Sequence, residues 1–172
     1  MFIKMNKQEF DTLEDEALVA ICFEPFISKI RGKSNTVKQE VYKQLNTGQK
    51  ALFMFSVYFN HARNSLAEFY WWSAYYLAQP NAWSEIKSAL RYFKAEEMQR
   101  LVEEIERVLV TRDFPSNLEE FNVSYNDLEN DPQLLATIGP LNTIFTGISP
   151  ATLKIIGEYI RNNPLEFICI ED

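Results

Sequence analysis

The sequence predicts an all-α fold, a single-domain bundle of about six to eight helices with one short pair of terminal strands. Apolar residues recur at helical spacing through most of the chain, and Gly, Pro and Asn residues separate the apolar segments. The chain has 172 residues, of which 47% are hydrophobic, and this is enough for one well-formed core. We therefore expect residues 1–172 to form one helical domain.

Capping and helix-breaking residues set where each helix is expected to begin and end. Pro25 should end or kink the first helix, and Ser34 or Asn35 can cap the second. In the helix over 95–110, Glu96 with Arg100 and Glu103 with Arg107 form acid-before-base pairs one turn apart. The expected helices span 7–31, 37–45, 49–78, 82–93, 95–110 and 151–162.

Irregular structure is expected after residue 113. Residues 113–132 are polar, and residues 132–148 should form two short helices or a kinked one around Gly139 and Pro140. Ser149 and Pro150 are a typical helix start, which places a new helix after them. A short strand over 165–170 can pair with residues 1–5.

The protein is expected to be located in the cytoplasm. The longest apolar segment, 51–78, contains polar residues such as His61, Arg63 and Glu68, which do not suit a membrane span. Residues 1–7 carry lysines and do not match a secretory signal.

Catalytic and metal sites are not expected, and neither is a cofactor. His61 is the single histidine, and the two cysteines, Cys22 and Cys169, lie in apolar segments that predict buried, unreactive thiols. The five glycines match no phosphate-binding loop. One enzyme hypothesis stays open, in which His61 and Glu68 line a deep pocket that the sequence hides.

Negative charge is concentrated in one stretch of the chain, residues 113–131. The net charge is -7, and no Lys or Arg lies between residues 113 and 153. Acids that gather in a loop commonly serve solubility alone, and this alternative stays open. An unpaired acidic surface also attracts a basic partner and speeds its association. We therefore expect a non-enzymatic binding protein that engages a basic protein through Asp113, Glu119, Glu120, Asp127, Glu129 and Asp131.

An aromatic segment provides an alternative contact surface. Ten aromatic residues lie between Phe53 and Tyr76, and most are expected in the core. Trp71 and Trp72 are adjacent and cannot both point the same way from a helix, so one should be partly exposed. Such a face would suit an immunity or stress-associated interaction protein.

Basic residues gather between residues 29 and 43, where a weak positive patch is expected. This patch could pair with the acidic stretch of the same or a neighbouring molecule, and a homodimer is one such assembly. It is too small to predict direct nucleic-acid binding in a chain with a pI of about 4.9. Its members are Lys29, Arg31, Lys33, Lys38 and Lys43.

Three segments resemble a bacterial family of unknown function that includes a DNA-mimic protein. They are Asn64–Ser73, Ser88–Glu97 and Tyr159–Phe167, and the resemblance covers roughly residues 40–168. The glycine pair of the family motif is Ser65 and Leu66 here, and its glutamine is Phe69. The resemblance implies an all-helical fold and a binding role. DNA mimicry would be the most specific form of that role, although six carboxylates are few for a surface that imitates duplex DNA.

Overall fold

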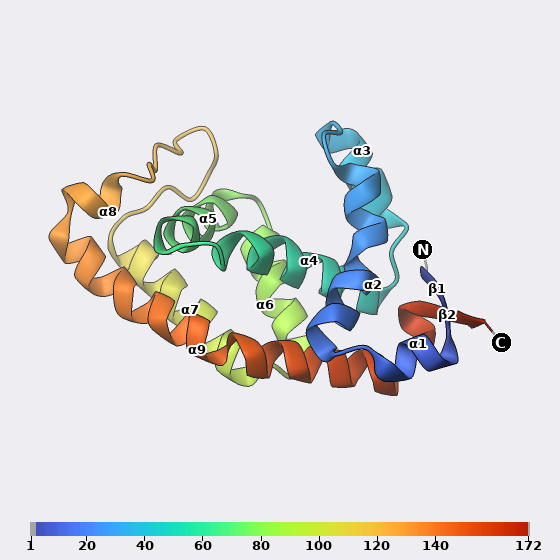
Figure 1. Ribbon diagram of the computed structural model, residues 1–172. Coiled ribbons are helices and arrows are strands. Elements are labelled where there is room, and N and C mark those ends of the chain that lie inside the picture. Colours follow the sequence, from blue (N-terminus) through green and yellow to red (C-terminus); the bar gives the residue numbers. More distant parts are fainter. Residues whose placement is uncertain (1–2, 172) are drawn as a thin grey trace.

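The longest element is α9 (Pro132–Asn162), which runs along one side of the molecule beneath the other helices (Figure 1). The computed structural model describes residues 3–171, and within them the all-α fold class and a terminal strand pair are confirmed. Residues 1–2 of the expected N-terminal strand lie outside the described residues. The other elements are β1 (Ile3–Asn6), α1 (Lys7–Thr12), α2 (Asp15–Ile30), α3 (Asn35–Lys43), α4 (Thr47–Ala62), α5 (Leu66–Ala78), α6 (Ala82–Tyr92), α7 (Glu96–Thr111), α8 (Asp127–Asn130), the 3-10 helix η1 (Pro164–Glu166) and β2 (Ile168–Glu171).

Helix α9 is continuous, so the alternative of two short helices around Pro140 and the expected new helix start after Ser149 were wrong. Each proline removes one hydrogen bond, which leaves the carbonyls of Ala136 and Thr146 without their usual donors. Both prolines and both of these residues are exposed, so water can solvate the freed carbonyls. The hydroxyl of Ser149 does not cap a helix, and it donates to the Phe145 carbonyl instead.

Two other boundaries differ from the expected ones. The segment 49–78 is divided at 63–65, where the Ser65 hydroxyl accepts a hydrogen bond from the Glu68 amide and caps α5. Helix α2 begins at Asp15 after a break at 13–14, and it continues through Pro25 to Ile30.

The expected ion pairs of α7 are confirmed in part. Arg100 pairs with Glu96 as expected, but Arg107 pairs with Glu104, and the carboxylate of Glu103 accepts a hydrogen bond from Gln99 instead.

Aromatic side chains join α4, α5 and α9 in the core. The ring of Phe145 from α9 lies 5.1 Å from Phe69 of α5 and 5.7 Å from Phe59 of α4, measured between ring centroids. Tyr58 is buried beside them and shares a hydrogen bond with the hydroxyl of Ser73. Most of the aromatic segment is therefore core, as the sequence predicted.

Both ends of the described chain meet at one end of the molecule. Strands β1 and β2 pair in parallel, with Ile3 opposite Ile168, and the ammonium of Lys4 lies 2.6 Å from Glu171. Nearby, the guanidinium of Arg161 donates to Asp15 and to the carbonyls of Phe10 and Leu13. These contacts attach α1 and the start of α2 to the C-terminal segment.

Candidate functional site

The acidic stretch and the Trp71–Trp72 pair, two separate candidates in the sequence, lie on one surface. The loop between α7 and α8, residues 112–126, passes over α5 (Figure 1). The indole of Trp71 donates a 3.0 Å hydrogen bond to the Val123 carbonyl. Its ring lies between two others, 5.0 Å from Tyr75 and 5.2 Å from Tyr125, and both are nearly parallel to it.

Phe121 completes this group, because its ring meets the rings of Trp71 and Tyr75 edge-on. The two residues before it, Glu119 and Glu120, are exposed. The loop therefore carries carboxylates beside a set of partly exposed rings. We call this set the aromatic–acidic surface, made of Glu68, Trp71, Trp72, Tyr75, Glu119, Glu120, Phe121 and Tyr125.

Trp72 extends the surface toward α4. It stacks on the imidazole of His61 with 3.8 Å between ring centroids, and its indole donates to the carboxylate of Glu68. Burial lowers the pKa of His61, and the negative charge of Glu68 opposes that shift. The pKa of Tyr125 is raised mainly by burial, and the negative charge of Glu68 raises it further. Trp71 and Trp72 are both partly exposed, whereas the sequence predicted partial exposure for one of them.

Two of the six predicted acids have structural tasks. Asp131 caps α9 by accepting from the amides of Gln133 and Leu134, and it pairs with Arg112 at 3.0 Å. The hydrogen bond from the backbone amide of Leu134 lowers the pKa of the Asp131 carboxyl, and the Arg112 side chain lowers it further. Asp127 accepts a 2.8 Å bond from the buried hydroxyl of Tyr70 and a 2.9 Å bond from the Ser124 amide.

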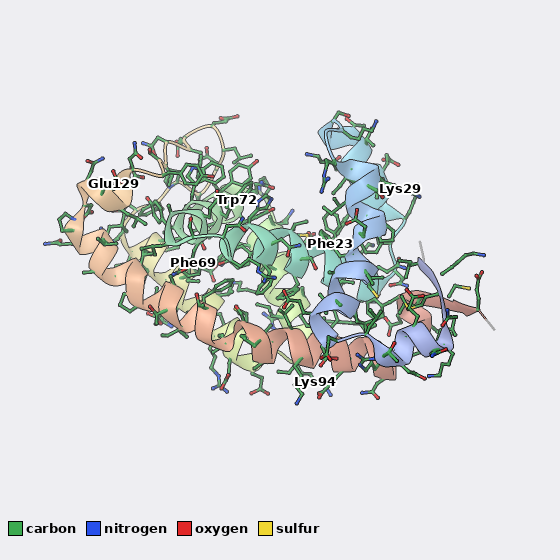
Figure 2. All side chains as sticks on the ribbon, in the orientation of Figure 1. Phe23, Lys29, Phe69, Trp72, Lys94 and Glu129 are labelled. Atoms are coloured by element: carbon green, nitrogen blue, oxygen red, sulfur yellow. The ribbon has the colours of Figure 1, made fainter. Side chains whose placement is uncertain are left out.

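The remaining predicted acids face solvent. Asp113, Glu119, Glu120 and Glu129 are exposed, and Glu120 accepts one bond from the Asn117 amide group. Figure 2 shows Glu129 of α8 and Lys29 of α2 at opposite sides of the molecule. The basic patch on α2 and α3 is exposed, and α3 packs against α2. Lys29 of this patch therefore lies far from Glu129 at the acidic end of the same chain.

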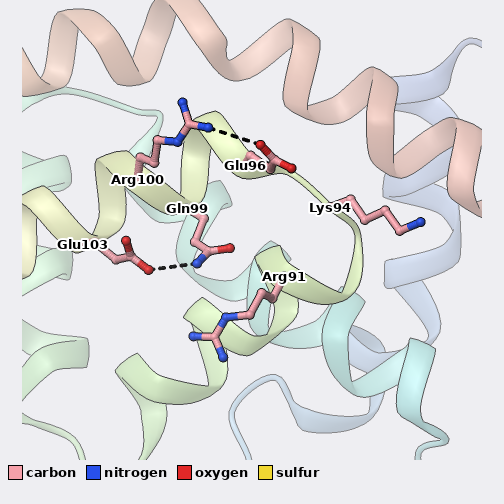
Figure 3. A pocket seen from close by; sticks show the side chains of 6 residues that line it. All are labelled: Arg91, Lys94, Glu96, Gln99, Arg100 and Glu103. Atoms are coloured by element: carbon pink, nitrogen blue, oxygen red, sulfur yellow. Dashed lines mark hydrogen bonds and ion pairs between the residues drawn. The ribbon is translucent and has the colours of Figure 1, made fainter.

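Two shallow hollows accompany these surfaces, and neither contains His61 or Glu68. One, of about 330 Å³, lies at the base of the loop and is lined by Tyr70, Arg112, Phe114, Asp127, Asn130, Asp131 and Leu134. The other, of about 380 Å³, lies between α6 and α7 and is lined by Arg91, Lys94, Glu96, Gln99, Arg100 and Glu103 (Figure 3). In the second, Arg100 pairs with Glu96 and Gln99 donates to Glu103, so much of its polar lining is already satisfied.

The two cysteines differ in their exposure to solvent. Cys22 is buried, and burial raises the pKa of its thiol to about 12. The expected burial of Cys169 was wrong, because alternate side chains of β2 face solvent and Cys169 is one of them. Within residues 3–171, no group of three or more His, Cys, Asp or Glu side chains could hold a metal ion. No helix in the same range is long and apolar enough to cross a membrane.

Comparison of the chain with protein-family models, with curated proteins and with solved structures gave no match. The resemblance to the family that includes a DNA mimic therefore stays a prediction.

Proposed function

We propose that this protein is a non-enzymatic, cytoplasmic binding protein that uses its aromatic–acidic surface to engage a basic segment of a partner protein. The single observation that carries the proposal is the stacking of Trp71 on Tyr75 and Tyr125 and its contact with Phe121, the residue that directly follows the exposed Glu119 and Glu120 in the loop. Aromatic residues are enriched where proteins bind one another, and they frequently dominate the binding energy.

Arginine is the partner side chain that suits this combination best. A guanidinium can stack on an aromatic face while it donates a forked pair of hydrogen bonds to a carboxylate. Lysine offers a point charge and gains less from the rings. The proposal is therefore a partner with exposed arginines.

DNA mimicry receives less support than a general basic partner. Duplex DNA carries one charge per about 1.7 Å of its axis. Asp127 and Asp131 are occupied by contacts within the chain, which leaves four freely exposed acids in residues 113–131. The cytoplasmic location agrees with the free thiols of Cys22 and Cys169, which are usual where thiols stay reduced.

The test compares partner capture by two variants of equal charge. The first neutralises Glu119, Glu120 and Glu129 to glutamine. The second neutralises Glu14, Glu24 and Glu97, three exposed acids with no ion pair in the described structure, and serves as the control. Capture from native cytosol at low and high salt should recover a partner with wild-type protein and with the control, and lose it with the first variant. Equal capture by both variants would contradict the proposal.

A second candidate rests on the stacked pair of Trp72 and His61. Their partly exposed rings offer an apolar contact, which suits the alternative of an immunity or stress-associated interaction protein. Under this alternative, capture resists high salt, is lost with Trp72→Ala, and survives neutralisation of Glu119, Glu120 and Glu129.

A further inference from the structure

Two tyrosine hydroxyls of the aromatic–acidic surface have no hydrogen-bond partner among the described residues. They belong to Tyr75 and Tyr125, and both rings are partly exposed, so water solvates these hydroxyls and a partner can replace that water. The other six of the eight tyrosines use their hydroxyls in bonds within the chain: Tyr42, Tyr58, Tyr70, Tyr76, Tyr92 and Tyr159.

The same two tyrosines are the ones that stack on Trp71. Their ring centroids lie 5.0 Å and 5.2 Å from that of the indole, at interplanar angles of 13° and 12°. The indole nitrogen of Trp71 already donates to the Val123 carbonyl, and that of Trp72 donates to Glu68. The hydroxyls are therefore the donors that these four rings still offer to a partner.

A donor pair beside aromatic rings suits a partner backbone with free carbonyls. Carbonyls inside a helix or a sheet already accept hydrogen bonds, whereas a polyproline II segment has no internal hydrogen bonds and a fully solvated backbone. Proline-rich segments adopt this conformation and bind aromatic-lined surfaces. Proline has no amide hydrogen, so such a segment is recognised through donors that reach its carbonyls.

The acidic part of the surface adds a charge requirement. Glu119 and Glu120 are exposed and directly precede Phe121, whose ring contacts those of Trp71 and Tyr75. Neither carboxylate has an ion pair with any described residue. A guanidinium forms a forked pair of hydrogen bonds with a free carboxylate. The segment that fits both parts of the surface therefore carries arginine beside its prolines.

We infer that the aromatic–acidic surface binds a proline-rich, arginine-bearing segment of a partner protein in the polyproline II conformation. This inference rests on the proposed function and names the kind of segment that is bound. Proline rings pack against Trp71, the hydroxyls of Tyr75 and Tyr125 donate to the carbonyls of the segment, and its arginines pair with the loop carboxylates. Because three residues make one turn, a repeat of two prolines and one arginine places its arginines along one side.

The test titrates the protein with two synthetic peptides of equal length and charge, followed by isothermal titration calorimetry. One consists of Pro-Pro-Arg repeats and the other of Ala-Ala-Arg repeats, which are not held in the polyproline II conformation. The proline peptide should bind about tenfold more tightly or better, because it is ordered before it binds. Equal affinity for the two peptides, or binding of neither, overturns the inference. Cytosolic capture with the Glu119, Glu120 and Glu129 variant decides the proposed function separately.

A second test removes the two hydroxyls and keeps the rings. The double variant Tyr75→Phe, Tyr125→Phe should bind the proline peptide about tenfold more weakly or worse, because two hydrogen bonds are lost. Its urea midpoint should equal that of wild type, since neither hydroxyl has a partner in the described structure. Tyr76→Phe is the control, because the Tyr76 hydroxyl lies 3.5 Å from the Val57 carbonyl inside the chain. Unchanged peptide affinity in the double variant would contradict the inference.

Discussion

The indole nitrogen of Trp71 donates a hydrogen bond to the backbone carbonyl of Val123, 52 residues further along the chain. Through this bond and the rings around it, helix α5 fixes a loop that has no helix or strand of its own. The position of Glu119 and Glu120 therefore depends on an aromatic side chain from a different part of the sequence.

Trp71→Ala should release the loop. The substitution removes the hydrogen bond and the ring contacts with Tyr75, Phe121 and Tyr125, and we expect it to lower the free energy of unfolding by about 2–4 kcal/mol. Hydrogen exchange followed by mass spectrometry should become faster in residues 117–126. Trp72→Ala is the control, because it leaves the Val123 bond in place. Equal loop exchange in the two variants would show that Trp71 does not anchor the loop.

Replacement by alanine should change the stability of the protein in opposite directions at two glycines of α9. In Gly157→Ala, the new methyl group collides with Asp15, so α2 and α9 have to move apart, at a cost of about 1–3 kcal/mol. In Gly147→Ala, the methyl group enters open space, and the helix should gain about 0.5–1 kcal/mol. Urea denaturation at low protein concentration measures both. A Gly157→Ala variant as stable as wild type would mean that the helices are not in close contact there.

The pH dependence of stability should include a contribution from His61. Burial holds its pKa below the usual 6.5, so the folded state favours the neutral imidazole. This contribution is complete above pH 6.5 and is lost as the pH falls through the lowered pKa of the folded state. Urea midpoints measured from about pH 7.5 to 5.5 should therefore fall more steeply for wild type than for His61→Gln. If the urea midpoints of wild type and His61→Gln fell in parallel with pH, His61 would make no contribution to the pH dependence of stability.

The two cysteines should react at very different rates with a thiol reagent. Cys169 is exposed in β2, whereas Cys22 is buried with a raised pKa, so little thiolate forms and the reagent cannot reach it. Mass spectrometry of the native protein should find one label, on Cys169, and a second label on Cys22 after unfolding. Rapid labelling of Cys22 in the native state would contradict its burial in α2.

The helical fold was predictable because apolar side chains recur at helical spacing in most segments. The start of α5 and the continuity of α9 were harder to predict, because each depends on individual residues and their surroundings. The break before α5 has a visible cause, the Ser65 cap followed by Glu68, which is a known start pattern. The continuity of α9 was not predictable from Pro140 and Pro150, because a proline is tolerated only where the freed carbonyl reaches water. That exposure is a property of the assembled bundle.

The candidate site was predictable as two lists of residues but not as one surface. The meeting of Trp71 with Val123 is a tertiary contact, and no local pattern predicts it. The structural role of Asp131 was more accessible, since an Asp directly before Pro132 is a typical cap followed by a typical first helical residue. That pattern would have separated Asp131 from the acids that remain free to bind a partner.

The parallel pairing of β1 with β2 also has a mechanical consequence. Because the two strands run in the same direction, tension applied through the start of β1 and the end of β2 pulls them past one another. In this shear geometry, the backbone hydrogen bonds between Ile3–Asn6 and Ile168–Glu171 bear the load together, along with the Lys4–Glu171 ion pair. The two-stranded sheet, the one sheet among the described residues, therefore acts as a clamp that has to yield before stretching force reaches the helices.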